Sequence, residues 1–368
     1  MNGSPYESPL VSVVVNNYNY GRFLREAIDS ALNQTYPRTE VVVVDDGSTD
    51  DSREIIYSYG DRVIPVLKMN GGQASAFNAG FAISRGDIVI FLDADDYLFP
   101  WAVERVAAAW KPGIAKVQYR LEMVDTFGNS IGFYPPANVP FDEGEVWRVL
   151  LETGNYQCPP TSGRSFGRAA LDKVLPVPEA AWRISADAYL RILIPFEGQI
   201  ISIEEALGAY RIHGSNLWAF NRWATQETVS VDRFRTFVTY DLQEHELLAR
   251  KASGLGHKVP PNLPLWNYRS VQYRIILLRL EPINPLVSSD RSVSLVYWGL
   301  RAIWRSSDFD LRSGIIHSIW FIWVGLTPLP IAKLAIAWLF VPGSRPRALE
   351  WLRKRVRSLG AYSKELGS

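Results

Sequence analysis

Three short apolar runs near the N-terminus constrain the fold of this chain more than any other feature. Residues 41–44 and 88–92 are continuous apolar stretches of strand length, and residues 11–15 are all valine apart from Ser12. Because polar residues do not alternate with the apolar ones, we expect strands covered on both faces, as in a parallel sheet between layers of helices. Helical patterns lie between the runs, so the sequence predicts an α/β fold with a doubly wound, mostly parallel sheet.

Polar residues follow each run, at the end of a parallel sheet where ligands bind. Asn16–Asn19, Asp45–Asp50 and Asp93–Asp96 come directly after the three runs. Ligands of open α/β sheets lie at the carboxyl ends of the strands, so these segments should converge on one edge. A β-to-helix turn with capping side chains also accounts for the second segment. Acidic residues from two strand ends at one crevice favour a nucleotide site.

The Asp-x-Asp pattern of Asp93 and Asp95 suggests a divalent metal ion. Burying such carboxylates without partners costs on the order of several kcal/mol each, so they need water, donors or a cation. Alternate residues leaving a strand can direct oxygens to a hard ion, and Mg²⁺ or Mn²⁺ completes its shell with phosphate oxygens and water. Asp also favours turns for local reasons, so the pattern alone is weak evidence.

Composition and missing motifs exclude several classes of protein. The 368 residues suffice for one large domain or two smaller ones. Cys158, the single cysteine, excludes an intramolecular disulfide and a cysteine-rich zinc site, and fits a reducing compartment. A formal net charge of +1 is small for a nucleic-acid-binding protein. Neither a Gly-x-Gly-x-x-Gly nor a P-loop pattern follows a strand, which disfavours dinucleotide redox chemistry and P-loop phosphoryl transfer.

Four motifs in order resemble those of the family 2 glycosyltransferases, which have the GT-A fold. They are VSVVVNNYN at 11–19, VVDDGSTD at 43–50, GGQASAFNAG at 71–80 and FLDADD at 91–96. The likeness is looser up to His213 and slight beyond it. It implies an inverting transfer of a sugar from a nucleoside diphosphate donor, with a UDP-sugar favoured, to an acceptor hydroxyl.

On the nucleoside side, the resemblance implies that Asn17 and Tyr18 line the base pocket. Asp45 or Asp46 would contact the base or the ribose. Asn78, in the third motif, would also belong to the donor-binding residues.

On the diphosphate side, the resemblance implies that Asp95 is the main ligand of Mn²⁺ or Mg²⁺. Asp93 would approach both the ribose and the metal, His213 would be a third ligand, and Arg211 would meet the diphosphate. A neutral imidazole suits such a ligand set, although a loop histidine is more often only solvated. Many members of the family carry Arg in place of Phe77, so a cationic donor contact is missing here or supplied elsewhere.

An inverting displacement needs a carboxylate that takes the acceptor proton. Asp187 is the candidate base, because it matches an acidic position at a helix start in the family. The alternative is ordinary helix chemistry, with Ser185 as the N-cap and Asp187 in the first turn. Arg164 and Arg168 are weaker candidates for contacts with the diphosphate or the acceptor.

The C-terminal third predicts helices that associate with a membrane. Residues 314–341 are almost wholly apolar but are split by prolines, which favours an interfacial or re-entrant hairpin over a span. Seven of the thirteen tryptophans lie from Trp266 onward, and residues 342–368 hold seven Lys or Arg against two Asp or Glu. Both features fit the headgroup region of an anionic leaflet. A hydrophobic helical pair that packs on the catalytic domain or forms a homo-oligomer contact is the alternative.

The predicted organisation is a catalytic domain over 1–220, with a donor half at 1–110 and an acceptor half at 111–220. A helical linker region over 221–290 and the apolar helices with their basic tail over 291–368 follow. Since residues 1–9 do not resemble a signal peptide, we expect a peripheral or monotopic enzyme on the cytoplasmic side of the cell membrane.

Its partners would be a nucleotide sugar, a glycan or lipid-linked acceptor and the membrane surface, but no nucleic acid. Its function would be in assembling a cell-surface polysaccharide or glycolipid. A sugar-1-phosphate nucleotidyltransferase and a non-catalytic membrane scaffold with a vestigial nucleotide pocket are the alternatives.

Overall fold

The protein is described here by a computed structural model in two compact units. The structure describes residues 8–213, 231–260, 267–283, 285–305 and 311–340. One unit comprises residues 1–213 with 243–263, and the other comprises 214–242 with 264–368. Helix α8 contributes residues to both units.

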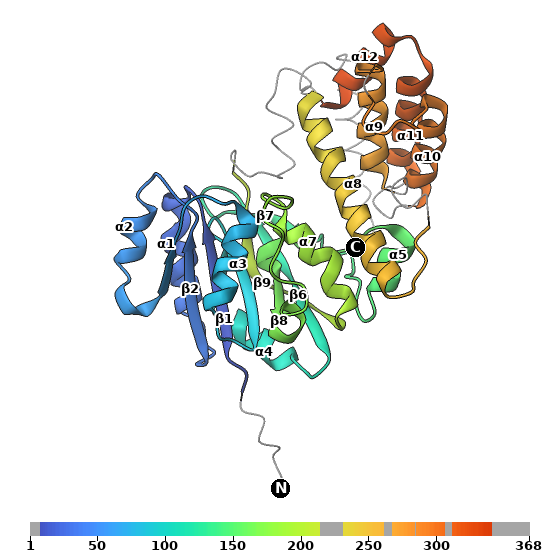
Figure 1. The fold of residues 1–368 in the computed structure, drawn as a ribbon. Coiled ribbons are helices and arrows are strands. Elements are labelled where there is room, and N and C mark those ends of the chain that lie inside the picture. Colours follow the sequence, from blue (N-terminus) through green and yellow to red (C-terminus); the bar gives the residue numbers. More distant parts are fainter. Residues whose placement is uncertain (1–7, 214–230, 261–266, 284, 306–310, 341–368) are drawn as a thin grey trace, which may run out of the picture. The chain divides into compact units, whose positions relative to one another are not determined.

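The first unit contains a nine-stranded sheet with helices against it (Figure 1). Its strands are β1 Val11–Asn17, β2 Thr39–Asp45, β3 Ile64–Leu67, β4 Ile88–Asp93, β5 Tyr97–Leu98, β6 Ile114–Val124, β7 Ser130–Tyr134, β8 Arg164–Gly167 and β9 Gln199–Arg211. Its helices are α1 Gly21–Leu32, α2 Ser52–Tyr57, α3 Gln73–Ile83, α4 Ala102–Ala109, α5 Trp147–Thr153, α6 Arg168–Leu171 and α7 Ala186–Leu193, with short 3₁₀ turns η1 Gly60–Arg62, η2 Thr161–Gly163 and η3 Ile194–Phe196.

Four neighbouring strands form a parallel half-sheet in the order β3-β2-β1-β4. The three apolar runs of the sequence become β1, β2 and β4, and their central residues are fully buried. The α/β architecture predicted from these runs is therefore confirmed. The parallel register also aligns the strand ends, because Asn17 pairs with Asp45 and Asn16 pairs with Asp93.

The other half of the sheet corrects the prediction that the sheet is mostly parallel. From β4 the order continues β8-β6-β9-β5, with β7 paired to β6. Of these contacts only β6 with β9 is parallel, whereas β4–β8, β6–β8, β5–β9 and β6–β7 are antiparallel. The sheet is mixed because β8 enters antiparallel beside β4.

Both faces of the parallel half-sheet are covered by apolar helix faces. On one face, α1, α2 and α4 bury aliphatic residues such as Leu24, Ile28 and Val103 against alternate residues of β1, β2 and β4. On the other face α3 packs closely, since a Cβ on Gly80 would lie 2.3 Å from a methyl group of Val14. Continuous apolar strands are thus explained by two covered faces.

The second unit is built from helices that share a separate apolar core (Figure 1). They are α8 Val231–Gly254, α9 Tyr268–Leu280, α10 Ser292–Arg305, α11 Leu311–Leu326 and α12 Leu329–Phe340. Helices α10 and α11 approach closely, because a Cβ on Gly299 would lie 2.4 Å from the ring of Phe321. The core joins residues of α9 through α12, including Ile275, Val324 and Ile336.

The apolar stretch near the C-terminus forms two short helices, α11 and α12, that meet at Thr327 and Pro328. Among the described residues, none of the helices combines the length and the apolar character that a membrane crossing requires. The basic tail of residues 342–368 lies outside the described residues.

Candidate active site

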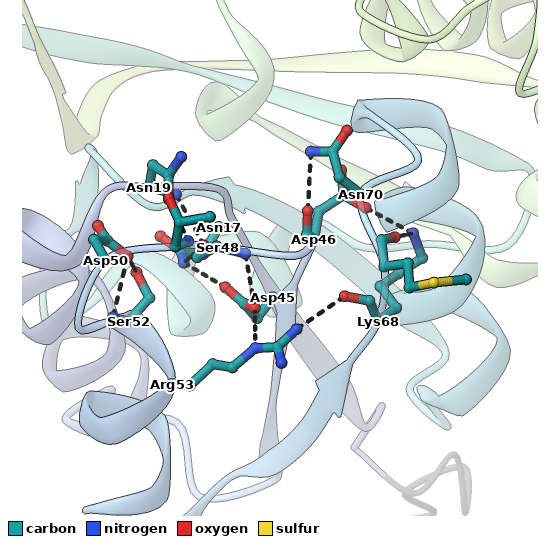
Figure 2. A network of polar contacts seen from close by, with 12 residues as sticks. Asn17, Asn19, Asp45, Asp46, Ser48, Asp50, Ser52, Arg53, Lys68 and Asn70 are labelled. Atoms are coloured by element: carbon teal, nitrogen blue, oxygen red, sulfur yellow. Dashed lines mark hydrogen bonds and ion pairs between the residues drawn. The ribbon is translucent and has the colours of Figure 1, made fainter.

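The carboxyl ends of β1, β2 and β4 meet at one edge of the parallel half-sheet, and their side chains differ in how they are bonded. Figure 2 shows the network around Asp45, a buried residue at the end of β2. Its carboxylate accepts hydrogen bonds from Nδ2 of Asn17 at 3.0 Å and the backbone N–H of Ser48 at 3.1 Å. It also forms an ion pair with Arg53 at 2.9 Å. Asp45 therefore ties the loops after β1 and β2 together.

The neighbouring Asp46 holds the glycine turn that starts the third motif. Its carboxylate accepts from Nζ of Lys68 at 2.6 Å and from the backbone N–H groups of Gly71 at 2.9 Å and Gly72 at 2.6 Å. Gly72 has a φ of 86°, and a Cβ there would lie 2.4 Å from the carbonyl oxygen of Arg183. The turn thus requires glycine. Contact of Asp45 or Asp46 with the base or ribose stays a prediction.

The other residues predicted for the nucleoside side have different environments. Tyr18 is 47% exposed beside the strand ends, as a ring available for stacking would be, whereas Asn17 is buried. Asn78 has its amide bonded to the backbone of Val177 in both directions, at 2.9 Å and 2.8 Å. In this structure Asn78 fixes the segment before α7 against α3, and its donor contact stays a prediction.

Carboxylates crowd together in the turn after β4, and two of them have raised pKa values. Dense packing around Asp93, and then the charges of Asp95 and Asp187, raise the pKa of Asp93 to about 8. Burial and the same kind of repulsion raise the pKa of Asp96 well above its ordinary value. Carboxylates so arranged favour a bound cation or a retained proton.

Asp96, which the sequence left without a role, is a structural residue. Its carboxylate accepts from Oγ of Ser162 at 2.6 Å and from the backbone N–H of Arg211 at 2.9 Å. It therefore joins the acidic turn to η2 and to the end of β9.

Asp95 and His213 lie in direct contact although 118 positions separate them. Nε2 of His213 is 2.9 Å from Oδ2 of Asp95, and Nδ1 is 3.4 Å from a guanidinium nitrogen of Arg22. The imidazole is buried against the rings of Tyr20 and Phe23. The two residues predicted as metal ligands are thus brought together by β4 and the end of β9.

The donor set of this pair fits a hard divalent ion that also binds phosphate. Mg²⁺ and Mn²⁺ at nucleotide sites take one or two carboxylates and fill the remaining positions with phosphate oxygens and water. Within the described ranges, the structure has no cluster of three or more His, Cys, Asp or Glu residues that could hold a metal. The side chain of Asp93, which is also predicted to approach the metal, is hydrogen-bonded to Thr161, and its contact with a metal stays a prediction.

Arg211 makes contacts within the protein in this structure, and its contact with the diphosphate stays a prediction. Its guanidinium donates to the backbone oxygen of Asp95 at 3.1 Å and pairs with Glu26 at 2.5 Å. It also lies over the rings of Phe23 and Tyr97. This buried arginine joins α1 to the acidic turn.

The candidate base Asp187 stands in the first turn of α7, with its side chain 29% exposed. In the described chain the Ser185 side chain makes no capping hydrogen bond. Instead, the backbone N–H of Ala186 donates to Oε1 of Gln73, at 3.0 Å. Buried Arg164 donates to the Asp187 backbone oxygen at 3.1 Å and lies 3.9 Å from its carboxylate. Gln73 and Arg164 thus fix the helix start that carries Asp187.

The structure also gives the environments of Arg168 and Phe77. Arg168 bonds the backbone oxygens of Gly86 and Ser84, at the opposite end of β4 from Asp93, so it is not a donor-site residue. Phe77 is buried, and its ring stacks on that of Phe91 with 4.2 Å between the ring centroids.

Three residues at the site were missed by sequence reasoning. Lys68 supplies a cation beside the glycine turn, Ser162 bonds the acidic turn, and Gln73 caps α7. Only Gln73 had a usable signal, because it follows the Gly-Gly pair of a quoted motif.

Comparison with known proteins agrees with the motifs. The sequence model described as glycosyl transferase family 2 matches residues 12–133. An uncharacterized glycosyltransferase of Nostoc sp. (strain PCC 7120) is 40% identical over 212 residues, which are 56% of this chain and 66% of the relative. Chondroitin synthase of Pasteurella multocida (strain Pm70) is 46% identical over 99 residues, which are 26% of this chain and 10% of the synthase. The aligned segments thus cover only part of each relative.

Comparison with solved structures finds two complexes that align over most of this chain. S. aureus TarS 1–349 in complex with UDP has a TM-score of 0.48 at 14% identity, covering 89% of this chain and 91% of that chain. The mannosyltransferase PcManGT from Pyrobaculum calidifontis, in complex with GDP-Man and Mn²⁺, has a TM-score of 0.45 at 18% identity, covering 90% and 85%. The motif order and the sequence matches establish the family: this chain belongs to the family 2 glycosyltransferases.

Proposed function

We propose that the protein is an inverting, metal-dependent glycosyltransferase that moves a sugar from a nucleoside diphosphate, UDP favoured, to an acceptor hydroxyl. The observation that carries this proposal is that the carboxylates around the end of β4 have different partners. Asp95 contacts His213, whereas Asp187 begins a helix and its charge acts on Asp93. One side thus suits a metal-bound diphosphate and the other suits a proton acceptor.

The reaction assigned to these residues is a single displacement. The acceptor oxygen forms a bond to the anomeric carbon while the bond from that carbon to the diphosphate oxygen breaks, and the electron pair leaves with the diphosphate. The acceptor proton goes to the carboxylate of Asp187. Arg164, which donates to the backbone of Asp187, keeps the helix start in place while leaving the carboxylate partly exposed.

Asp95 and His213 would hold the metal ion, as their oxygen and nitrogen donors already lie 2.9 Å apart. When bound, Mg²⁺ or Mn²⁺ stabilises the negative charge that develops on the leaving diphosphate. Tyr18, half-exposed at the end of β1, would contact the base.

The acceptor proposed is a growing glycan or a lipid-linked sugar at the cytoplasmic side of a membrane. Two relatives support a carbohydrate polymer, since the Pasteurella multocida proteins are a chondroitin synthase and a hyaluronan synthase. In both cases the match covers 26% of this chain and 10% of the synthase.

A thermal-shift screen of UDP, GDP and CDP, each with and without Mn²⁺, tests the site and the base together. We expect one nucleotide to raise the melting temperature only when Mn²⁺ is present. The corresponding nucleotide sugars should then be turned over, slowly to water and faster with an acceptor. Absence of any metal-dependent shift would remove the support for this function.

A further inference from the structure

The exposed side of α11 is apolar. Leu311, Ile315, Ile319, Ile322 and Leu326 recur at helical spacing along one stripe and are 45% to 69% exposed. Ile316 flanks the stripe and is also exposed. On a monomeric soluble protein, a row of large exposed aliphatic side chains marks an interaction surface.

The opposite side of α11 is already used for packing. Phe321, Val324 and Gly325 are buried in the core of the second unit, and Trp320 donates from its indole to the backbone oxygen of Ala335 at 2.8 Å. The helix is thus apolar on both sides, unlike an ordinary surface helix with one polar side. Core packing explains only the buried side.

Helices α12 and α10 also have exposed apolar or aromatic residues. Leu329, Ile331 and Leu334 on α12 are exposed. Trp304 at the end of α10 is half-exposed, and its ring lies against Gly314 of α11, where a Cβ would be 3.3 Å away. Helices α10 and α11 lie side by side (Figure 1). The aromatic ring therefore borders the α11 stripe, as expected at a headgroup boundary.

Positive charge is concentrated in the part of the sequence that forms most of this unit. Residues 264–368 hold fifteen Lys or Arg against six Asp or Glu, whereas residues 1–263 hold twenty-four against thirty-two. The C-terminal part thus carries +9 and the rest −8. Exposed Arg301, Arg305, Arg312 and Lys333 lie on the same helices as the apolar residues. Basic side chains around an apolar surface complement anionic lipid headgroups.

The length of the helices decides between lying on a bilayer and crossing it. Helix α11 has 16 residues and α12 has 12. At about 1.5 Å per residue, neither reaches the roughly 30 Å of a hydrocarbon core. A helix with one apolar side available and basic neighbours lies in the plane of the interface.

We propose that the α11 stripe, with the exposed residues of α12 and the basic side chains beside them, docks the protein on the surface of an anionic lipid bilayer. This surface belongs to the second unit alone. Docking would bring the sugar-transfer site to a lipid-linked acceptor, and only this purpose rests on the proposed function.

Flotation of the full-length protein with vesicles tests the docking. The vesicles are phosphatidylcholine alone or phosphatidylcholine mixed with phosphatidylglycerol, each at low and high salt. The test variant is Ile319→Asp/Ile322→Asp, and the matched control is Ile83→Asp/Ile131→Asp, which changes two half-exposed isoleucines of the first unit. All four positions are exposed, and circular dichroism checks that each variant is folded.

We expect the wild type and the control to float with the anionic vesicles, and to do so less at high salt because the basic residues are screened. The test variant should bind at least about tenfold more weakly, since charges replace residues that enter the interface. The proposal is overturned if the wild type does not float, or if the test variant floats as well as the control.

A third outcome would assign the stripe to a second copy of the chain. In that case the wild type would self-associate in vesicle-free buffer, the test variant would be monomeric by light scattering, and neither would float. This result also overturns bilayer docking. Metal-dependent nucleotide binding, measured on the same samples, reports separately on the proposed function, so the two proposals can fail independently.

Discussion

The two acidic strand ends of the parallel half-sheet, those of β2 and β4, lie on either side of β1 and are bonded in different ways. At the end of β2, Asp45 and Asp46 accept from backbone N–H groups and pair with Arg53 and Lys68. At the end of β4, repulsion from Asp95 adds to burial and raises the pKa of Asp93. The first pair is neutralised by the protein itself, and the second cluster leaves charge for a cation or a proton.

The comparison shows that similar acidic residues can have a structural role at one strand end and a chemical role at another. A carboxylate that holds backbone amides rigidifies the loops that surround a ligand. A carboxylate crowded by others stores unfavourable electrostatic energy, which a bound cation or a proton relieves. We therefore expect substitutions at the end of β2 to lower stability and those around the end of β4 to alter chemistry.

The largest effect is expected for Asp187→Asn, in the first turn of α7. Removing a general base costs about 10² to 10⁴-fold in rate. We expect kcat for sugar transfer to fall by this factor while metal-dependent nucleotide binding stays within about twofold, because Asn keeps the shape of the side chain. The control is Asp172→Asn, an exposed residue that follows α6. Unchanged kcat in Asp187→Asn would favour the non-catalytic scaffold.

Asp93→Asn tests the charge crowding at the end of β4 through the pH dependence of stability. The folded pKa of about 8 lies above that of an aspartate in the unfolded chain, about 3.9, so the folded protein binds the extra proton. Raising the pH from about 4 to about 8 therefore lowers the free energy of unfolding through this group. We expect Asp93→Asn to be the more stable protein at pH 8, by on the order of a few kcal/mol, and the difference to shrink at pH 5. Urea denaturation in EDTA measures it, and parallel pH profiles would contradict the expectation.

Asp46→Ala tests the opposite claim for the end of β2. The substitution leaves Lys68 and two backbone N–H groups without their acceptor. We expect the free energy of unfolding to fall by about 2 to 4 kcal/mol. The matched variant is Asp95→Ala, which should lose less stability because it also removes repulsion. If both lose the same amount in urea denaturation, the contrast between the two strand ends is wrong.

Asp95→Asn is expected to act on binding of the metal and nucleotide. Loss of one charged ligand should weaken Mn²⁺-dependent nucleotide binding by about tenfold or more, since hard cations prefer carboxylate oxygens. His213→Gln should have a smaller effect in the same direction. Calorimetric titration of nucleotide with and without Mn²⁺ measures both, and Mn²⁺-dependent binding that survives in Asp95→Asn would exclude this residue as the main ligand.

The parallel half of the fold could be predicted because its signals are local. Residues 11–15, 41–44 and 88–92 are apolar with the single exception of Ser12, and polar residues follow each run. Convergence of the three strand ends follows from parallel pairing alone. The nearness of Asp95 and His213 came instead from a family resemblance, since no local pattern connects residues so far apart.

The mixed half of the sheet could not be predicted because its central strand, β6, contains buried polar residues and lacks a continuous apolar pattern. Strand β6 carries Lys116, Gln118 and Arg120 among its apolar residues, and all three are buried. Lys116 is bonded to Tyr156 at 2.8 Å, and its pKa is lowered to about 8 by burial. Such partners are distant in the sequence. From sequence alone, a polar residue in a strand is therefore predicted to be exposed.

The partners of individual carboxylates were equally hidden. Asp45 and Asp95 both follow apolar strands in similar acidic contexts, and only tertiary contacts distinguish a carboxylate that holds a loop from one that faces a histidine. For the same reason the sequence left Arg168 as a weaker candidate for the site, whereas the structure has it at the far end of β4.

The smallest expected effect concerns Gln73, which connects the third motif to the candidate base. Its side chain accepts from the N–H of Ala186 across 113 positions, a contact that replaces a local helix cap. Loss of a cap costs about 1 kcal/mol, so Gln73→Ala should lower the melting temperature by a few degrees, about 2 to 4 °C for a chain of this size class. The matched control is Ser185→Ala, which should change stability less, because the Ser185 hydroxyl does not cap α7 in the described chain. Sugar transfer should slow in Gln73→Ala and recover in Gln73→Glu, whose carboxylate can accept the same N–H. If Ser185→Ala proves the more destabilising of the two, α7 is capped locally, and the link from the glycine turn to Asp187 does not contribute to positioning the base.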